Sequence, residues 1–294
     1  MTNTHTFGAR TSADEVLADI DLAGKNIVIT GANIGIGYES ARALAAAGAR
    51  VIFACRSIEK GEAAVANAKL AHPGCLAEFV QLDLASFENI KNFSKQLSLA
   101  TIDVLICNAG IFSRKYSQTI EGFEMTVGVC HFGHFLLTHL LMDRLLVANK
   151  PRVVMVSSES HRTPKKLNFD KFPLNKDQFS SLTSYGQAKL ANVLFANELQ
   201  RRYAGKGLTA CSLHPGTFVT TNIAGDNILM KLISPFTKNP NQGAATTVFC
   251  AINAKEEDIA GRYLSHCKIN RSTKEANNLD VASKLWALSE DVCL

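Results

Sequence analysis

A glycine-rich turn near the amino terminus combines residues that can hold phosphate groups. The segment Thr30-Gly-Ala-Asn-Ile-Gly-Ile-Gly37 places glycines at 31, 35 and 37. Gly31 permits a tight turn, while Gly35 and Gly37 let the backbone approach a pyrophosphate and let a helix pack on a strand. The free N–H groups of a helix that begins here would face the anion. The spacing differs from Gly-x-Gly-x-x-Gly, and the turn lacks the Lys-Ser/Thr pair of a nucleoside triphosphate loop.

Arg56 bears on which dinucleotide such a turn would serve. The strand predicted at 50–54 is followed by Cys55 and Arg56, with no acidic residue. A carboxylate here would bind the ribose 2′-hydroxyl of NAD, whereas an arginine can meet the 2′-phosphate of NADP. A charge-assisted hydrogen bond contributes about 1.5–3 kcal/mol, enough for a tenfold preference. Unless Arg56 is simply a surface residue at a helix start, the sequence favours NADP(H) over NAD(H).

These residues need a scaffold that brings the ends of several strands together. Short β-branched runs alternate with helical segments along the chain. The predicted strands are 26–30, 50–54, 77–81, 104–107, 152–156, 208–213 and one near Tyr263, and the predicted helices are 38–47, 58–70, 87–96, 123–147, 184–203, 242–253 and 281–288. The alternation predicts an α/β fold, a Rossmann-type doubly wound parallel sheet of about seven strands with helices on both faces. We expect a leader segment at 1–20 and a single domain over 21–294.

Composition and charge exclude several classes of protein. The 294 residues are 47% hydrophobic and 19% charged, unlike a disordered or low-complexity chain. The net charge of +5 is spread out, and its densest pairs, Lys165-Lys166 and Arg201-Arg202, are too short for a nucleic-acid site. We find no secretory signal and expect no integral membrane segment, so a cytoplasmic location is predicted. The eight cysteines show no zinc spacing and are expected to be reduced thiols rather than metal ligands.

Six motifs occur in an order that is specific as a set. They are Thr30-Gly-x-x-x-Gly-x-Gly37, Asp83-Leu84, Asn108-Ala-Gly110, Ser158, Tyr185-x-x-x-Lys189 and Pro215-Gly216. Through them the chain resembles the short-chain dehydrogenase/reductase family over residues 21–288, although each motif alone is weak. Within that family, Gly133-His-Phe-Leu-Leu-Thr138 and Ser184-Tyr-Gly-Gln-Ala-Lys-Leu-Ala-Asn192 resemble the branch of retinol dehydrogenases and WW-domain oxidoreductases.

The resemblance implies catalytic roles for Ser158, Tyr185 and Lys189. Tyr185 would exchange a proton with the carbonyl or hydroxyl oxygen of the substrate. A free phenol ionises only near pH 10, so reaction near pH 7 needs a positive charge beside it. Lys189, one helical turn from Tyr185, would supply that charge and hold the nicotinamide ribose hydroxyls. Ser158 would bind the substrate oxygen. Taken singly, the three could instead be a helix cap, a core aromatic and a solvated lysine.

The resemblance also implies a cofactor site at the carboxyl ends of the strands, where open α/β sheets bind ligands. Asp83 and Leu84 would flank the adenine, although Asp83 could equally be a turn residue. Asn108, Ala109 and Gly110 would line the adenosine ribose, and Pro215, Gly216 and Thr220 the nicotinamide end. The full predicted set of cofactor residues is Gly31, Asn33, Ile34, Gly35, Ile36, Gly37, Arg56, Asp83, Leu84, Asn108, Ala109, Gly110, Tyr185, Lys189, Pro215, Gly216 and Thr220.

Three positions depart from the family pattern. Cys130 stands at a catalytic position where the family usually has an asparagine that helps hold a water beside the lysine. Cysteine is a weak hydrogen-bond partner, so we expect slower proton exchange with hydride transfer retained. Ile34 replaces a serine common near the phosphates, and Cys107 replaces the first asparagine of Asn-Asn-Ala-Gly. These changes motivate an alternative to an enzyme, namely a catalytically weakened NADP(H)-binding regulatory or interaction protein.

The segment 222–240 bears on the substrate, because in this fold it would cover the nicotinamide end as a lid. It is rich in apolar residues, which favours an apolar alcohol, ketone or aldehyde. The alternative is that these side chains only pack the segment onto the core. We therefore expect an NADP-dependent alcohol dehydrogenase or carbonyl reductase with a small-molecule substrate and no nucleic-acid partner. The family also implies a homo-oligomer that pairs through the helices predicted at 123–147 and 184–203.

Overall fold

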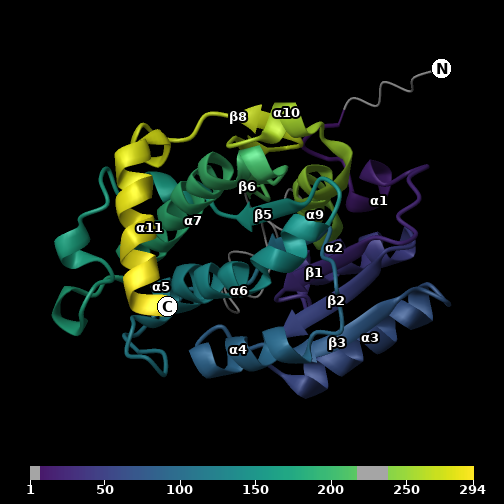
Figure 1. Ribbon diagram of the computed structural model, residues 1–294, viewed down its shortest axis with the longest axis horizontal. Helices are drawn as coiled ribbons and strands as arrows, with labels where there is room; N and C mark the ends of the chain where they lie inside the picture. The colour runs from purple at the N-terminus through teal and green to yellow at the C-terminus, as the bar shows by residue number, and fades with distance from the viewer. Residues whose placement is uncertain (1–6, 217–237) are drawn as a thin grey trace.

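Seven parallel strands and one short antiparallel edge strand form a single sheet (Figure 1). The computed structural model describes residues 7–216 and 238–294. The strand order is β3-β2-β1-β4-β5-β6-β7-β8. The strands are β1 (Asn26–Thr30), β2 (Arg50–Cys55), β3 (Ala77–Gln81), β4 (Val104–Cys107), β5 (Arg152–Val156), β6 (Thr209–His214), β7 (Tyr263–Ser265) and β8 (Lys268–Asn270). The predicted doubly wound parallel sheet is confirmed, with β8 as an additional strand.

The central strands are buried on both faces, as their continuous apolar sequences predict. In β1, Val28 faces one core layer, whereas Ile27 and Ile29 face the other, and all three are fully buried. Sequence patterns missed β8 because its three residues are all exposed and its one apolar residue, Ile269, forms no alternating pattern. Lys268 and the brevity of β8 suit an edge strand, since a charged, short edge resists pairing with other chains.

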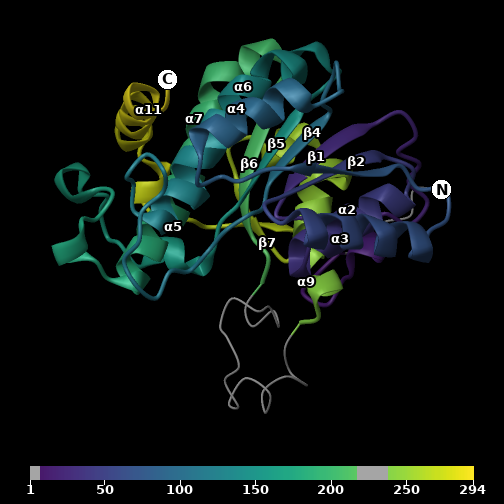
Figure 2. The ribbon, with the colours of Figure 1, turned by 90° about the horizontal axis from the view of Figure 1, so that it is seen from below.

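Helices cover both faces of the sheet, so two core layers result. Figure 2 shows α4, α6, α7 and α11 on one side and α2, α3 and α9 on the other. The helices on the first side are α4 (Phe87–Gln96), α5 (Met125–Val127), α6 (Gly133–Val147), α7 (Ser181–Tyr203) and α11 (Leu279–Cys293). Those on the second side are α1 (Ala13–Val16), α2 (Gly35–Ala46), α3 (Ile58–Ala71) and α9 (Pro240–Val248), and α10 (Glu256–Ile259) precedes β7. Residues predicted as a leader lie on the domain: Ala13 is buried in α1, and its N–H donates to Asn241.

The long helix predicted at 123–147 is interrupted by one wider turn. α5 leads into the π-helical turn η1 (Gly128–Phe132), which leads into α6. The span Met125–Val147 is long and apolar enough to cross a membrane, but 83% of its most apolar window is buried inside the protein. Its apolar character therefore reflects a position in the core. Single π turns inside α-helices occur frequently at functional sites, and this one contains Cys130.

His131, in the same turn, makes the stability of the fold depend on pH. Its ring lies among Phe132, Phe135, Phe172 and Phe195, and burial lowers its pKa to about 3. An unfolded histidine titrates near pH 6.5, so between these two values the unfolded chain binds a proton that the folded chain excludes. Stability therefore falls as the pH drops below 6.5.

We predict that His131→Phe reduces this loss of stability at acid pH. Phenylalanine suits the aromatic surroundings, and Ser289 keeps its hydrogen bond to the Leu285 carbonyl. Between pH 7 and pH 5 the variant should lose about 2 kcal/mol less unfolding free energy than the parent. Urea unfolding at both pH values measures the difference. Parallel losses in the two proteins would show that His131 does not titrate on unfolding.

Candidate active site

The glycine-rich turn is as tight as its sequence predicts. Gly31 and Gly35 adopt positive φ angles of 67° and 60°, which glycine adopts without strain. A Cβ at residue 37 would lie 2.2 Å from the Gly31 carbonyl oxygen, so only glycine fits there. α2 begins here with Ile34 as its N-cap, 56% exposed and without a side-chain cap. The first N–H groups of α2 are therefore not capped by this residue, which suits an anionic ligand.

Asn108 joins this turn to the end of β4. Its side-chain amide donates to the Thr30 carbonyl at 2.9 Å, and the backbone N–H groups of Asn108 and Ala109 donate to the Thr30 hydroxyl, each at 2.9 Å. β1 and β4 are neighbours in the sheet, so their carboxyl ends lie together. The structure thus brings together the predicted residues Gly31, Asn108 and Ala109.

Tyr185 and Lys189 lie on one face of α7, as their spacing predicts. Lys189 Nζ is 5.6 Å from the centre of the Tyr185 ring, and the Phe112 ring packs against Tyr185 in a T-shaped arrangement with centroids 5.5 Å apart. Lys189 is only 3% exposed, and its ammonium donates to the Val156 carbonyl at 3.0 Å. Within the described parts of the chain, no carboxylate forms an ion pair with it. The structure therefore places a buried positive charge next to the Tyr185 ring.

Ser158 follows β5 and caps the short 3-10 helix η2 (Glu159–Arg162). Its hydroxyl accepts the Ser160 N–H at 3.2 Å, and its carbonyl accepts from His161 Nδ1 at 2.7 Å. Gly186 packs directly against this loop, because a Cβ there would lie 3.0 Å from the Ser160 carbonyl oxygen. The glycine next to Tyr185 therefore lets α7 approach the Ser158 segment closely. Sequence reasoning did not assign it, although a glycine beside a proposed catalytic tyrosine was a usable signal.

Glu124 is a second feature that the sequence analysis missed. This buried carboxylate caps α5, accepting the N–H groups of Thr126 and Val127 at 2.8 and 3.0 Å. It also accepts a short hydrogen bond from the hydroxyl of Ser184, the residue before Tyr185. α7 is thereby fixed to the start of the helix that carries Cys130. Such a long-range pair of a glutamate and a serine leaves no pattern in a single sequence.

Cys130 lies beside the lysine, as its predicted position requires. A Cβ at Gly110 would lie 3.0 Å from Lys189 Nζ and 3.6 Å from Cys130 Sγ. The fully buried thiol makes only a weak contact to the Ile111 carbonyl at 3.8 Å. Cys107 is also fully buried, near the hydroxyl of Thr138, and burial raises its pKa to about 12. Cys107 is therefore a neutral core thiol rather than a reactive group.

The residues predicted to lie on the adenine side are placed around the ends of β2 and β3. Arg56 is exposed directly after β2, and no ion pair involves it in the described chain. One Asp83 oxygen accepts the Ala85 N–H at 3.0 Å, so Asp83 does serve as a turn residue. Leu84 is 5% exposed and packs into the core, where its carbonyl closely approaches Gly133.

Pro215 and Gly216 follow β6 at the same edge of the sheet. Gly216 has a φ of 118°, and a Cβ there would lie 2.7 Å from Lys238 Nζ. The Lys238 ammonium donates to His266 Nδ1 at 3.0 Å. Thr220 and most of the predicted lid at 222–240 lie outside the described residues.

The comparisons with known proteins agree with this geometry. Residues 25–169 match the family model described as short chain dehydrogenase. The chain is 40% identical to a WW domain-containing oxidoreductase of Gallus gallus, over 97% of this chain and 72% of that protein. It is also 40% identical to retinol dehydrogenase 12 of Mus musculus, over 92% of this chain and 87% of that protein. The chain belongs to the short-chain dehydrogenase/reductase family.

Its relatives place it in the retinol dehydrogenase-like branch of these oxidoreductases. A crystal structure of an uncharacterised Mycobacterium paratuberculosis protein aligns with a TM-score of 0.77 and 35% identity, covering 94% of this chain and 96% of that one. The fold of this family implies a nicotinamide cofactor. The narrow turn at Gly37, the helix start at Ile34 and the buried Lys189 ammonium all fit such a dinucleotide.

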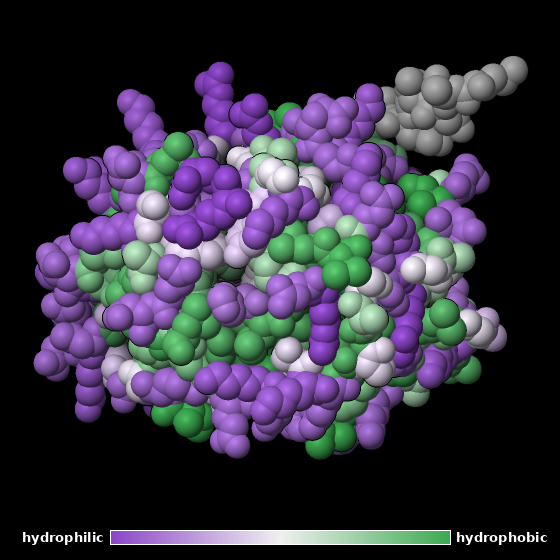
Figure 3. Space-filling model, viewed as in Figure 1, coloured by the Kyte–Doolittle hydropathy of each residue, from purple (hydrophilic) through white to green (hydrophobic). Residues whose placement is uncertain are grey.

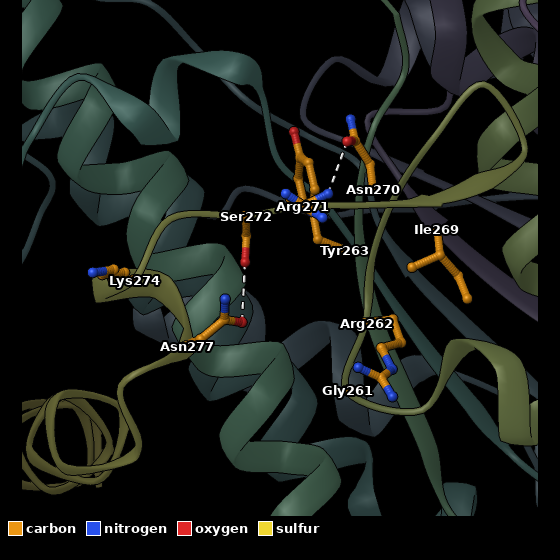
Figure 4. A pocket seen from close by; sticks show the side chains of 9 residues that line it. All are labelled: Gly261, Arg262, Tyr263, Ile269, Asn270, Arg271, Ser272, Lys274 and Asn277. Atoms are coloured by element: carbon orange, nitrogen blue, oxygen red, sulfur yellow. Dashed lines mark hydrogen bonds between the residues drawn. The ribbon is translucent and has the colours of Figure 1, made fainter.

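A groove of about 670 Å³ lies elsewhere, beside β7 and β8 (Figure 4). Its lining residues are Gly261, Arg262, Tyr263, Ile269, Asn270, Arg271, Ser272, Lys274 and Asn277. None of them belongs to the motifs of the short-chain dehydrogenase/reductase family. Tyr263 turns its hydroxyl toward Glu159, to which it donates at 3.0 Å, so the groove borders the back of the Ser158 loop.

We predict that Gly37→Ala disables the dinucleotide site. The added methyl would lie 2.2 Å from the Gly31 oxygen and 2.4 Å from the Asn108 side chain, so the turn must open. Overpacking of this kind costs about 1–3 kcal/mol. Fluorescence titration with NADPH should show at least tenfold weaker binding. Gly205→Ala is the control, because a Cβ there meets nothing within 4 Å, and equal affinity of both variants would contradict the prediction.

Proposed function

We propose that the protein is an NADP(H)-dependent oxidoreductase that interconverts an apolar alcohol and its ketone or aldehyde. The observation that carries the proposal is the buried Lys189 ammonium 5.6 Å from the centre of the Tyr185 ring. Membership of the short-chain dehydrogenase/reductase family supports oxidoreductase chemistry. The nicotinamide cofactor, when bound, donates or accepts a hydride.

Residues of the chain itself transfer the proton and orient the substrate. Tyr185 passes a proton to the substrate oxygen during reduction and takes it back during oxidation. Lys189 stabilises the phenolate left after proton transfer and keeps donors available for the ribose hydroxyls, since Val156 engages only one of its three. The Ser158 hydroxyl, held on its η2 loop by Ser160 and backed by Gly186, orients the substrate oxygen.

Cofactor choice in this proposal rests on Arg56. Its exposed guanidinium follows β2 without an ion-pair partner among the described residues, which leaves it available to a 2′-phosphate. The apolar residues within 222–240 support an apolar substrate.

The same proposal includes a cytoplasmic location, because all eight cysteines are free thiols and most are buried. A homo-oligomer is also proposed. Figure 3 shows hydrophobic side chains gathered over α6 among hydrophilic ones, and Val147, the last residue of α6, is 70% exposed. An interface of this kind would use one of the two helices that the family resemblance implies.

The alternative function is a cofactor-binding regulatory protein, which the poor hydrogen bonding of Cys130 favours. Binding of NADPH without turnover of any aldehyde or ketone would support this alternative. Turnover of even one carbonyl compound would support the enzyme.

We predict that Tyr185→Phe lowers turnover by about 10²–10⁴-fold, because it removes the proton donor and leaves the ring in place. NADPH oxidation with a panel of apolar aldehydes and ketones measures the rate, and the affinity for NADPH should change less than threefold. Tyr203→Phe, on the same helix, is the control and should retain the parent rate. Equal rates in both variants would remove Tyr185 from the mechanism.

We predict that Arg56→Ala weakens NADPH binding about tenfold to a hundredfold, as loss of a charge-assisted hydrogen bond requires. The affinity for NADH should stay within twofold, because NADH has no 2′-phosphate. Lys69→Ala, at the far end of α3, is the matched control for loss of a surface charge. Equal weakening toward both dinucleotides would show that Arg56 does not select the cofactor.

A further inference from the structure

His134 is a fully buried histidine near the start of α6 that the proposed mechanism does not use. Its two ring nitrogens contact two different parts of the site. Nδ1 lies 3.0 Å from the Cys130 carbonyl oxygen in the π turn, and Nε2 lies 2.8 Å from the Thr30 hydroxyl at the end of β1. One side chain thus links the glycine-rich turn to the group formed by Cys130, Gly110 and Lys189, which we call the lysine cluster.

The chemistry of these contacts fixes where the protons lie. A carbonyl oxygen only accepts, so Nδ1 of His134 carries the proton and donates it to Cys130. Burial lowers the pKa of His134 to about 4, so the ring is neutral near pH 7. In a neutral ring Nε2 is then an acceptor, and the Thr30 hydroxyl must donate to it.

This direction determines what the Thr30 oxygen can do. Because its hydrogen points to His134, both of its lone pairs are free to accept the N–H groups of Asn108 and Ala109 at 2.9 Å. The hydroxyl then has one donor and two acceptor contacts, which is its full capacity. The competing acceptor, the Ile106 carbonyl, is farther away at 3.5 Å.

The other end of the chain of hydrogen bonds, at Cys130, lies close to the lysine. Cys130 lies beside Gly110 and Lys189, and Gly110 directly follows the two residues whose N–H groups Thr30 accepts. Thr30 itself precedes Gly31 of the phosphate-binding turn. The residues joined by hydrogen bonds from the glycine-rich turn to the lysine cluster are therefore, in order, Thr30, His134 and Cys130.

We infer that His134 is a positioning residue that holds the glycine-rich turn and the lysine cluster in register, so that dinucleotide affinity depends on its two hydrogen bonds. The inference rests on the proposed function in one respect, namely that a dinucleotide is the ligand. The histidine itself touches neither cofactor nor substrate in this assignment.

The first test reads the tautomer of His134 in the ligand-free protein. ¹⁵N NMR of histidine-labelled protein should show His134 protonated on Nδ1. His131 is the internal contrast: the Ser289 hydroxyl donates to the Leu285 carbonyl, so His131 must be protonated on Nε2 to donate to Ser289. The variants His134→Leu and His131→Phe assign the signals. A proton on Nε2 of His134 would overturn the inference.

The second test is a double-mutant cycle on NADPH affinity. His134→Leu keeps the apolar volume and removes both hydrogen bonds, and Thr30→Val removes the hydroxyl at nearly constant volume. Each should weaken NADPH binding at least tenfold. The double variant should be no more than about twofold weaker than the weaker single variant, because both changes break the same chain of bonds. His131→Phe, which alters a buried histidine of the same helical segment, should bind NADPH within twofold of the parent.

The outcomes separate this inference from the proposed function. If the parent protein binds neither NADPH nor NADH, the proposed function fails. If the parent binds NADPH and His134→Leu binds it equally well, or if the two single effects multiply, the inference alone is overturned. Should His134→Leu fail to fold, His134→Gln replaces it, since its amide both donates and accepts, and it should bind NADPH at least fivefold more tightly than Thr30→Val. Equal affinities of these two variants would contradict the inference.

Discussion

The buried ammonium of Lys189 is the constraint on which the site depends. A lysine that is 3% exposed must have its charge satisfied, and the described residues offer it the Val156 carbonyl but no carboxylate ion pair. Burial of a charge is costly unless hydrogen bonds or an opposite charge compensate it. Here the ammonium lies 5.6 Å from the centre of the Tyr185 ring.

The surrounding structure brings backbone close to this lysine and to the glycine-rich turn. Glycines at 37, 110 and 186 stand where a Cβ would meet backbone or side chain at 3.0 Å or less. Gly37 lets α2 approach the glycine-rich turn, Gly110 lets its loop approach Lys189, and Gly186 lets α7 approach the Ser158 loop. The precision of the site therefore comes from small residues that let elements touch, as close packing requires.

The π turn shows how the fold accommodates a cysteine at position 130. Cys130 keeps its place beside Lys189, but its thiol offers only a weak contact. Its carbonyl nevertheless accepts a hydrogen bond from His134, which in turn accepts one from Thr30. The backbone of this π turn thus makes a strong hydrogen bond where the thiol makes only a weak one, and through His134 the turn is joined to the glycine-rich segment.

The sequence by itself determined the fold class, the order of the seven parallel strands along the chain and the residues at their carboxyl ends. These features follow from local periodicity and from short motifs such as Tyr185-x-x-x-Lys189, which a single helix places on one face. It predicted neither β8, whose residues are all exposed, nor α1, which is one turn long. The single helix predicted at 123–147 gave no sign of its π turn, because a π turn has no distinct apolar period.

Only the tertiary structure decided which distant groups meet. Glu124 with Ser184 and Thr30 with His134 are separated by 60 and 104 residues, and each pairing depends on how helices dock on the sheet. The histidines illustrate the difference most clearly. His131 and His134 stand three residues apart in one apolar helix, yet packing turns one toward Ser289 of α11 and the other toward Thr30 of β1. A sequence pattern specifies the helix, whereas the partner of each buried polar atom depends on contacts between distant segments.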